Sequence, residues 1–236
     1  EYGMFMKTGF RLLLLSVIVV TVLSSNFLVL AKQDELELTI IELKLDESSK
    51  TVYTSSTDDS AANTGYKLLG YHWDSTINLY VNPSNKYGFA SSSVVTTITT
   101  SAKTWGDETS YPVFTYIGTT TKIAGKLDGI NVVSWGSYKN GVIAVTYIWY
   151  NKATGHMVET DCTMNTRYKW SLSGEVNKMD VQNIMTHEFG HFCGLADLYN
   201  SGDYWLTMYG YSNYGVTYQR TLGRGDILGL QKVYGP

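Results

Sequence analysis

The chain contains the segment His187-Glu188-Phe189-Gly190-His191-Phe192-Cys193-Gly194-Leu195-Ala196-Asp197. Two histidines four residues apart on a helix lie on the same face, one turn from each other, so both imidazoles can bind one metal ion. Glu188 lies beside them and can accept a proton from a metal-bound water. The helix can end at Gly194, because glycine adopts the left-handed conformation without steric cost. The chain can then turn and bring Asp197 back as a third ligand.

This combination predicts a catalytic zinc site in which His187, His191 and Asp197 bind the metal and Glu188 is the general base. Three protein ligands leave a fourth position open for water, which is typical of a catalytic zinc site and not of a closed structural site. The alternative is a pair of hydrogen-bonded histidines without a metal. The glycine and the aspartate at these spacings disfavour that alternative.

Length and composition indicate one enzyme-sized domain. The 236 residues suit one catalytic domain plus a small extra segment, and we expect a monomer. Apolar residues make up 44% of the chain, enough for a packed core, whereas charged residues make up only 17%. The net charge of −3 gives no indication of nucleic acid or of an acidic membrane surface as a partner.

The N-terminal region has the layout of a secretory signal peptide. Lys7 and Arg11 precede a mostly apolar run at residues 12–23, and small residues before Lys32 provide a cleavage site. Residues 1–31 are therefore predicted to be a signal peptide and the protein to be secreted. The alternative is an uncleaved membrane anchor, because residues 12–31 are about long enough to span a bilayer.

Residues 32–65 are predicted to be a short pro-segment and a Ser/Thr-rich linker that precede a catalytic domain at residues 66–236. The first half is acidic and amphipathic, and it could form a strand or a helix that covers the site. It contains no cysteine, which excludes a thiolate as the blocking group. Asp34, Glu35 and Asp46 are candidate blocking carboxylates, and a solvated face is the alternative interpretation.

Within the catalytic domain, short strands alternate with three helices. The hydrophobic periodicity predicts strands at residues 77–81, 113–117, 130–135, 143–150 and 157–164. It predicts helices at residues 91–105 and 225–234, and a third that begins near Asp180 and carries the metal motif. An α+β fold follows.

The remaining cysteines and histidines carry weaker signals. Cys162 and Cys193 fit an oxidising compartment, and both a disulfide between them and two buried thiols remain open. We interpret His72 and His156 as ordinary surface or packing histidines.

The pattern H-E-x-x-H-x-x-G-x-x-D, followed by Met208 at residues 206–210, resembles the metzincin clan of zinc endopeptidases. The similarity to matrixin-type catalytic domains covers roughly residues 70–236, with the zinc motif and the closing segment at residues 225–235 as its most specific parts. The resemblance implies a zincin-like five-stranded mixed, twisted sheet with three helices and an active-site cleft. It also implies that Met208 packs beneath the metal.

The same resemblance implies how a substrate binds. The strand at residues 143–150 would be an exposed edge onto which a peptide adds in antiparallel fashion. Residues 208–220 would line the pocket for the side chain that follows the cut bond.

This chain departs from most metzincins at two points. Asp197 stands where most of them have a histidine, as in the snapalysin-like branch, so we expect the zinc to be a slightly weaker Lewis acid. The histidine-rich loop that holds a second zinc in animal matrixins has no counterpart, so one catalytic zinc is expected. Calcium is neither indicated nor excluded.

The sequence therefore predicts a secreted zinc metalloendopeptidase that acts on proteins or peptides. The alternative is a catalytically weak, secreted zinc-binding or adhesion module, which nothing in the sequence favours, because Glu188 and the three ligands are all present. A third interpretation is a hydrolase of glycopeptides or cell-wall peptides.

Overall fold

The computed structural model describes residues 35–47 and 63–236. The predicted signal peptide at residues 1–31 and most of the predicted linker lie outside the described residues. The chain divides into two units, residues 1–37 and residues 38–236, and the second unit contains the features described below. Within the described part of the chain, no helix has the length and apolar character that crossing a membrane requires.

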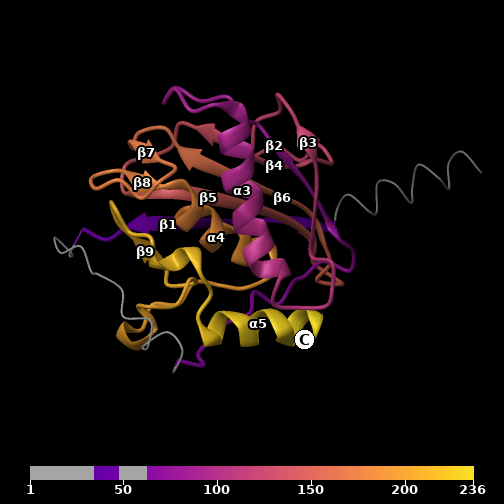
Figure 1. Ribbon diagram of the computed structural model, residues 1–236. Helices are drawn as coiled ribbons and strands as arrows, with labels where there is room; N and C mark the ends of the chain where they lie inside the picture. Colours follow the sequence, from indigo (N-terminus) through magenta and orange to yellow (C-terminus); the bar gives the residue numbers. More distant parts are fainter. Residues whose placement is uncertain (1–34, 48–62) are drawn as a thin grey trace, which may run out of the picture. The chain divides into compact units, whose positions relative to one another are not determined.

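The second unit is built on a mixed sheet with the strand order β3-β2-β4-β6-β5-β1-β9 (Figure 1). Strands β2, β3, β4 and β6 run parallel to one another, and β5 is antiparallel to β6. Two further short strands, β7 and β8, pair separately. The strands are β1 (Leu36–Leu45), β2 (Ile77–Val81), β3 (Phe114–Thr119), β4 (Asn131–Gly136), β5 (Val142–Asn151), β6 (Met157–Asn165), β7 (Trp170–Ser171), β8 (Met179–Asp180) and β9 (Tyr211–Ser212).

Three α-helices accompany the sheet in the described residues: α3 (Ser91–Gly106), α4 (Val181–Phe192) and α5 (Arg224–Tyr234). Two short 3-10 helices, η1 (Ser201–Asp203) and η2 (Tyr218–Arg220), lie between α4 and α5. Helices α3 and α4 pack against each other, and the Trp105 indole N–H donates to the Thr186 carbonyl at 2.7 Å. The predicted α+β class with a mixed sheet and three helices is confirmed.

The five predicted strands all form, but the sheet has two strands more than expected, and the strand expected at its edge is covered. Five strands were predicted, and β1 and β9 extend the sheet on the far side of β5. Strand β5 is therefore not an exposed edge, because β1 occupies that position. The alternation of β1 explains its place: Leu43 is fully buried, whereas Leu38 and Ile40 are 47% exposed, so one face of the strand packs inward.

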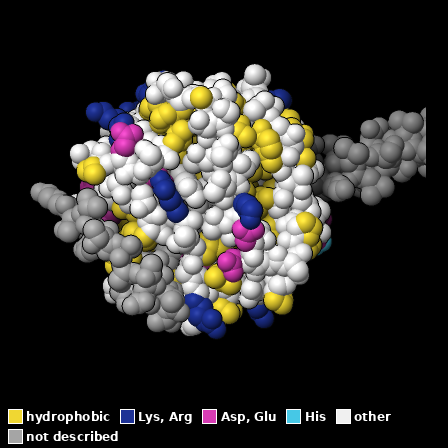
Figure 2. Space-filling view, in the orientation of Figure 1, with side chains coloured by type: hydrophobic (Ala, Val, Ile, Leu, Met, Phe, Trp, Pro, Cys, Tyr) yellow, Lys and Arg dark blue, Asp and Glu magenta, His cyan; other side chains and the backbone are white. Residues whose placement is uncertain are grey.

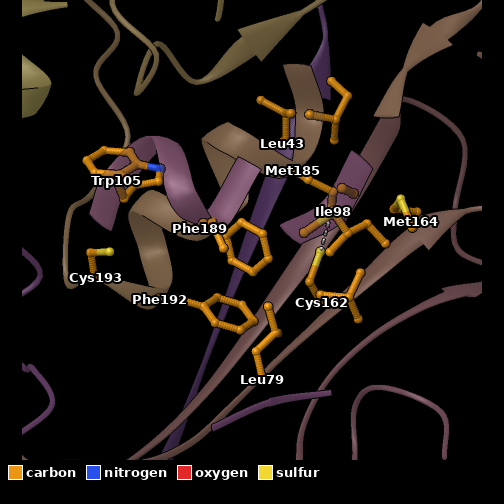
Figure 3. Packing of buried hydrophobic residues seen from close by; sticks show 14 of the residues in the cluster. Leu43, Leu79, Ile98, Trp105, Cys162, Met164, Met185, Phe189, Phe192 and Cys193 are labelled. Atoms are coloured by element: carbon orange, nitrogen blue, oxygen red, sulfur yellow. Dashed lines mark hydrogen bonds between the residues drawn. The ribbon is translucent and has the colours of Figure 1, made fainter. Parts of the chain in front are cut away.

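The hydrophobic core lies between the sheet and the helices. Figure 3 shows Ile98 and Trp105 of α3 with Phe189 of α4 above the sheet, and Leu43 of β1 belongs to the same buried cluster. Every residue of α4 except Gln182 is buried, including the metal motif, so the helix is held rigidly in the core.

Both cysteines are free and buried, so the disulfide that the sequence left open is not formed. Figure 3 shows Cys162 and Cys193 on opposite sides of Phe189 and Phe192, which keeps the sulfur atoms apart. The Cys162 thiol contacts the Met185 thioether, with 3.9 Å between the sulfur atoms. Burial raises the pKa of both thiols, so they act as small apolar side chains.

Candidate metal centre

Both ends of α4 are fixed by specific residues. At its start, the Asp180 carboxylate accepts from the Asn183 backbone N–H at 2.9 Å and forms an ion pair with Arg220. After its end, Gly194 has a φ of 91°. A Cβ atom at this position would approach the Tyr71 carbonyl oxygen to 2.8 Å, so only glycine fits. The chain turns sharply here, as the sequence predicted.

The turn brings Asp197 back to the two histidines of α4. The ligand atoms of His187, His191 and Asp197 lie within 4.8 Å of one another. Asp197 Oδ1 is 3.1 Å from His187 Nε2 and 3.4 Å from His191 Nε2, and all three side chains are buried. The three residues predicted to bind the metal therefore converge on one point.

The donor set fits a zinc ion. Among the described residues, His187 Nε2, His191 Nε2 and Asp197 Oδ1 have no hydrogen-bond partner. Buried polar atoms without partners are costly, and three of them directed at one point indicate that a cation completes the site. Two imidazole nitrogens and one carboxylate oxygen are ligands that zinc accepts in catalytic sites.

Backbone carbonyls orient both imidazoles. The Thr207 carbonyl lies 2.7 Å from His187 Nδ1, and the Leu195 carbonyl lies 2.8 Å from His191 Nδ1. A carbonyl oxygen can only accept, so each Nδ1 carries the hydrogen and each Nε2 keeps its lone pair for the metal. The sequence predicts such partners in general but cannot name them.

Asp197 is held in its ionised form. Burial alone would raise its pKa, but His191 and His187 outweigh burial and lower the pKa of Asp197 well below its usual range. Conversely, burial would lower the pKa of His191, and the Asp197 carboxylate raises it to about 9, so a metal that binds Nε2 has to displace a proton from that nitrogen. The Tyr199 hydroxyl donates to Asp197 Oδ2 at 2.9 Å, which leaves Oδ1 for the metal.

Glu188 lies beside the ligands with one oxygen held and the other free. Its Oε2 accepts from the Thr146 hydroxyl at 2.5 Å, whereas Oε1 has no partner among the described residues. Burial raises the pKa of Glu188, so a proton on this carboxylate is easier to hold than in water. Thr146 was missed by the sequence interpretation, and the one available signal is a hydroxyl in an otherwise apolar stretch of β5.

The turn at Met208 is anchored to α5. The Asp226 carboxylate accepts from the backbone N–H groups of Thr207 (2.8 Å), Met208 (3.1 Å) and Gly223 (2.8 Å). Burial raises the pKa of Asp226 to about 6. A Cβ atom at Gly190 would lie only 2.1 Å from the Met208 sulfur, so Met208 packs directly against the metal-binding helix. The role of Asp226 was also missed from sequence.

The other two histidines form a separate cluster on the surface. His72 Nε2 lies 3.1 Å from Asp74 Oδ1, and His156 Nδ1 lies 2.7 Å from Asp74 Oδ2. About half of each side chain is exposed. The two residues are thus surface histidines, as predicted, but they share one carboxylate and form a second group of possible metal ligands.

The segment that forms this site is similar to a known protein family. The matrixin family model matches residues 137–235. The match extends from just before β5 to the end of α5, so it includes the metal motif and the turn at Met208. No curated protein sequence matches the chain significantly.

Proposed function

Because the chain carries a matrixin-like metzincin domain, which is a metalloprotease domain, we propose that it is a secreted zinc-dependent endopeptidase. The observation that supports this proposal most directly is Glu188, a buried carboxylate with one unpartnered oxygen, next to three unpartnered metal donors. A module that only binds zinc has no need of such a carboxylate.

The residues of the site divide the chemistry among them. His187, His191 and Asp197 would hold zinc, which when bound lowers the pKa of water at the site toward neutrality and polarises the scissile carbonyl. Glu188 accepts the proton of the attacking water and delivers it to the leaving amine. Thr146 holds Glu188 in place through Oε2, which leaves Oε1 without a partner and available to accept the proton.

The proposal of secretion rests on the signal-peptide layout of residues 1–31. The division into a signal peptide, a pro-segment with linker at residues 32–65 and a catalytic domain at residues 66–236 likewise remains a prediction. We expect a monomer that acts on extracellular proteins or peptides.

The test is cleavage of unfolded casein by the zinc-loaded chain, with Glu188→Ala beside it and bound zinc counted in both. We expect the wild type to cleave and Glu188→Ala not to cleave at the same zinc content. A Glu188→Ala protein that retained zinc and the full rate would contradict the proposed role of Glu188.

A further inference from the structure

The two histidines of the metal centre are oriented by carbonyls of different origin. The carbonyl that contacts His191 belongs to Leu195, four residues later, in the turn that directly follows α4. The carbonyl that contacts His187 belongs to Thr207, twenty residues later and beyond η1. The orientation of His187 therefore depends on what holds the Thr207 carbonyl in place.

The side-chain amide of Gln219 is the second contact of this carbonyl. Gln219 Nε2 lies 3.4 Å from the Thr207 carbonyl oxygen. The same nitrogen lies 3.4 Å from the Tyr209 carbonyl oxygen and 3.5 Å from that of Tyr211. Each contact is long, but together they turn three alternate carbonyls of this segment toward one amide. Gln219 thus gathers the backbone on both sides of Met208.

Gln219 is in turn held by Asn183 in the first turn of α4. The Gln219 backbone N–H donates to Asn183 Oδ1 at 2.9 Å, and Asn183 Nδ2 donates to Gln219 Oε1 at 2.8 Å. The Ser212 hydroxyl donates to the same Oε1 at 3.0 Å. Both amide side chains are fully buried. Each amide therefore has one orientation, because turning it would place donor against donor or acceptor against acceptor.

These contacts close a ring on the metal-binding helix. The ring runs from His187 to the Thr207 carbonyl, then to Gln219 and to Asn183. Asn183 precedes His187 by four residues, so the two side chains lie on the same face of α4, one turn apart. The Thr207 carbonyl is thus fixed relative to the helix whose histidine it orients.

Building on the zinc site of the proposed function, we infer that Asn183 and Gln219 are positioning residues for His187. Gln219 holds the Thr207 carbonyl against His187 Nδ1, and Asn183 holds Gln219. Through this carbonyl they keep the hydrogen on Nδ1 and the lone pair of Nε2 available for zinc. His191 has a local partner and does not depend on the ring. This positioning role requires bound zinc but not protease activity.

The first experiment measures zinc affinity of the full chain in competition with a chelator. Gln219→Met replaces the amide by an apolar side chain of similar length. We expect its zinc affinity to fall about tenfold, the low end of the loss that follows removal of an outer partner of a metal ligand. A Gln219→Met protein that binds zinc as tightly as the wild type would overturn the inference.

Asn131→Leu is the matched control for general destabilisation. Asn131 is also a buried amide, on β4, which carries none of the predicted ligands. Its Nδ2 donates to the Asn78 carbonyl at 3.2 Å, and its Oδ1 accepts from the Thr160 N–H at 2.8 Å. We expect Asn131→Leu to lower the Tm, because it leaves buried backbone groups without partners, but to keep the zinc affinity. Equal losses of zinc affinity in Asn131→Leu and Gln219→Met would refute the positioning role.

The second experiment tests whether the two amides act as one unit. Losses that pass through one ring overlap, so Asn183→Leu/Gln219→Met should lose less zinc affinity than the product of the two single fold-changes. Fold-changes that simply multiply would show that the residues act separately, which contradicts the ring. At saturating Co²⁺ in place of zinc, the visible absorption spectrum should change in Gln219→Met and stay unchanged in Asn131→Leu. A wild-type spectrum in Gln219→Met would show that His187 keeps its orientation, and would also overturn the inference.

Casein cleavage by the zinc-saturated wild type, measured beside these affinities, separates the inference from the proposed function. If the wild type cleaves casein while Gln219→Met keeps the full zinc affinity, the protease function stands and the positioning role fails. If Gln219→Met alone loses zinc affinity and the wild type cleaves nothing, the positioning role stands and the protease function fails.

Discussion

At the scale of single residues, the catalytic carboxylate depends on a neighbour that is distant in sequence. Thr146 donates to Glu188 Oε2 across a separation of 42 residues, and both side chains are buried. A buried hydrogen bond to a carboxylate restricts the orientation of the acceptor as well as its pKa. Thr146 is therefore a positioning residue for the proposed reaction.

We expect Thr146→Val, which keeps the shape of the side chain, to lower kcat about tenfold, because a hydrogen bond to a charged group is worth roughly 1.5 kcal/mol. KM and the zinc content should change little, and Thr146→Ser should restore most of the rate. Steady-state kinetics on a casein-derived peptide, with zinc counted for each protein, measure this. An unchanged kcat in Thr146→Val would show that Glu188 is positioned without it.

A second residue-scale prediction concerns metal affinity. The Tyr199 hydroxyl holds Asp197 Oδ2, and loss of a partner that orients a metal ligand typically costs 10-fold to 100-fold in affinity. We expect Tyr199→Phe to bind zinc about tenfold more weakly in competition with a chelator. Tyr116→Phe, at an exposed position on β3, is the control and should bind zinc as the wild type does. Equal affinities for the two variants would contradict the role of Tyr199.

At this scale, the sequence could predict the site residues that lie close together along the chain. His187, Glu188, His191 and Asp197 lie on one helix and the turn that follows, so their convergence depends on short-range geometry alone. Thr146, Tyr199 and Asp226 act through hydrogen bonds whose partners are chosen by tertiary packing. No periodicity or motif in the sequence predicts such contacts.

At the scale of elements, the turn at Met208 depends on one carboxylate of α5. Asp226→Ala would leave the N–H groups of Thr207, Met208 and Gly223 without their acceptor. We expect the free energy of unfolding to fall by roughly 3 kcal/mol, since each buried unsatisfied group costs about 1–3 kcal/mol and part of the turn can relax. Urea denaturation at pH 8 measures this, and Asp107→Ala, which removes an exposed ion pair, should change stability by less than about 1 kcal/mol.

The attachment of β1 should depend on pH through Glu42. Its pKa is lowered from the usual 4.5, so the contact with Lys139 stabilises the bound strand above pH 4.5 and is lost as the pH falls through the lowered value. The backbone N–H groups of Leu45 and Asp46, which donate to the Gly141 and Ser212 carbonyls, should therefore exchange faster at low pH. Comparison with Glu42→Gln, normalised for intrinsic exchange, tests this: the same pH dependence in both proteins would exclude Glu42 as its origin.

Most elements could be predicted because their residues repeat with a clear period. Strand β2 has the predicted bounds, α3 and α5 differ from the predictions by one residue at one end, and β5 is one residue longer at each end. Strand β1 was left open between strand and helix, because an amphipathic segment pairs with whichever edge the folded chain offers. Strand β9 comprises only Tyr211 and Ser212, too short for any period, and exists because β1 lies beside it.

At the scale of the whole molecule, positive and negative side chains are mixed, so neither sign of charge dominates the electrostatic field. Figure 2 shows Lys and Arg side chains on the drawn face scattered among acidic and uncharged ones, and the net charge of the chain is only −3. Long-range attraction of a strongly charged substrate therefore has little basis on this face. Selectivity instead has to arise from local contacts with the substrate.

The loop between β3 and β4 shows how the molecule fixes an irregular segment with side chains. Asp161 of β6 accepts from the backbone N–H groups of Gly125 (2.7 Å) and Val132 (2.9 Å), and Glu159 accepts from that of Asp128 at 3.0 Å. Burial raises the pKa of Asp161 to about 7. Two carboxylates of one strand thus fix this loop through hydrogen bonds. This is consistent with a chain that has few histidines available as ligands of structural metal sites.

The number of zinc ions per chain tests this view of the whole molecule. The chain has four histidines, and the structure divides them into two clusters that each contain one aspartate. The donor atoms of the buried cluster have no hydrogen-bond partners, whereas His72 and His156 are half-exposed and already paired with Asp74. Only in the buried cluster would a bound cation coordinate ligand atoms that otherwise have no partner. We therefore expect one tightly bound zinc.

Metal analysis after dialysis should find one zinc in the wild type and in a His72→Ala/His156→Ala double variant, and none in His187→Ala. Removal of zinc by a chelator should lower the Tm of the wild type and of the double variant equally, since a ligand present at 100 times its Kd stabilises the folded state by about 2.7 kcal/mol. Two zinc ions in the wild type and one in the double variant would contradict the prediction. That result would make the Asp74 cluster a second metal site, joining the segment before β2 to the β5–β6 hairpin.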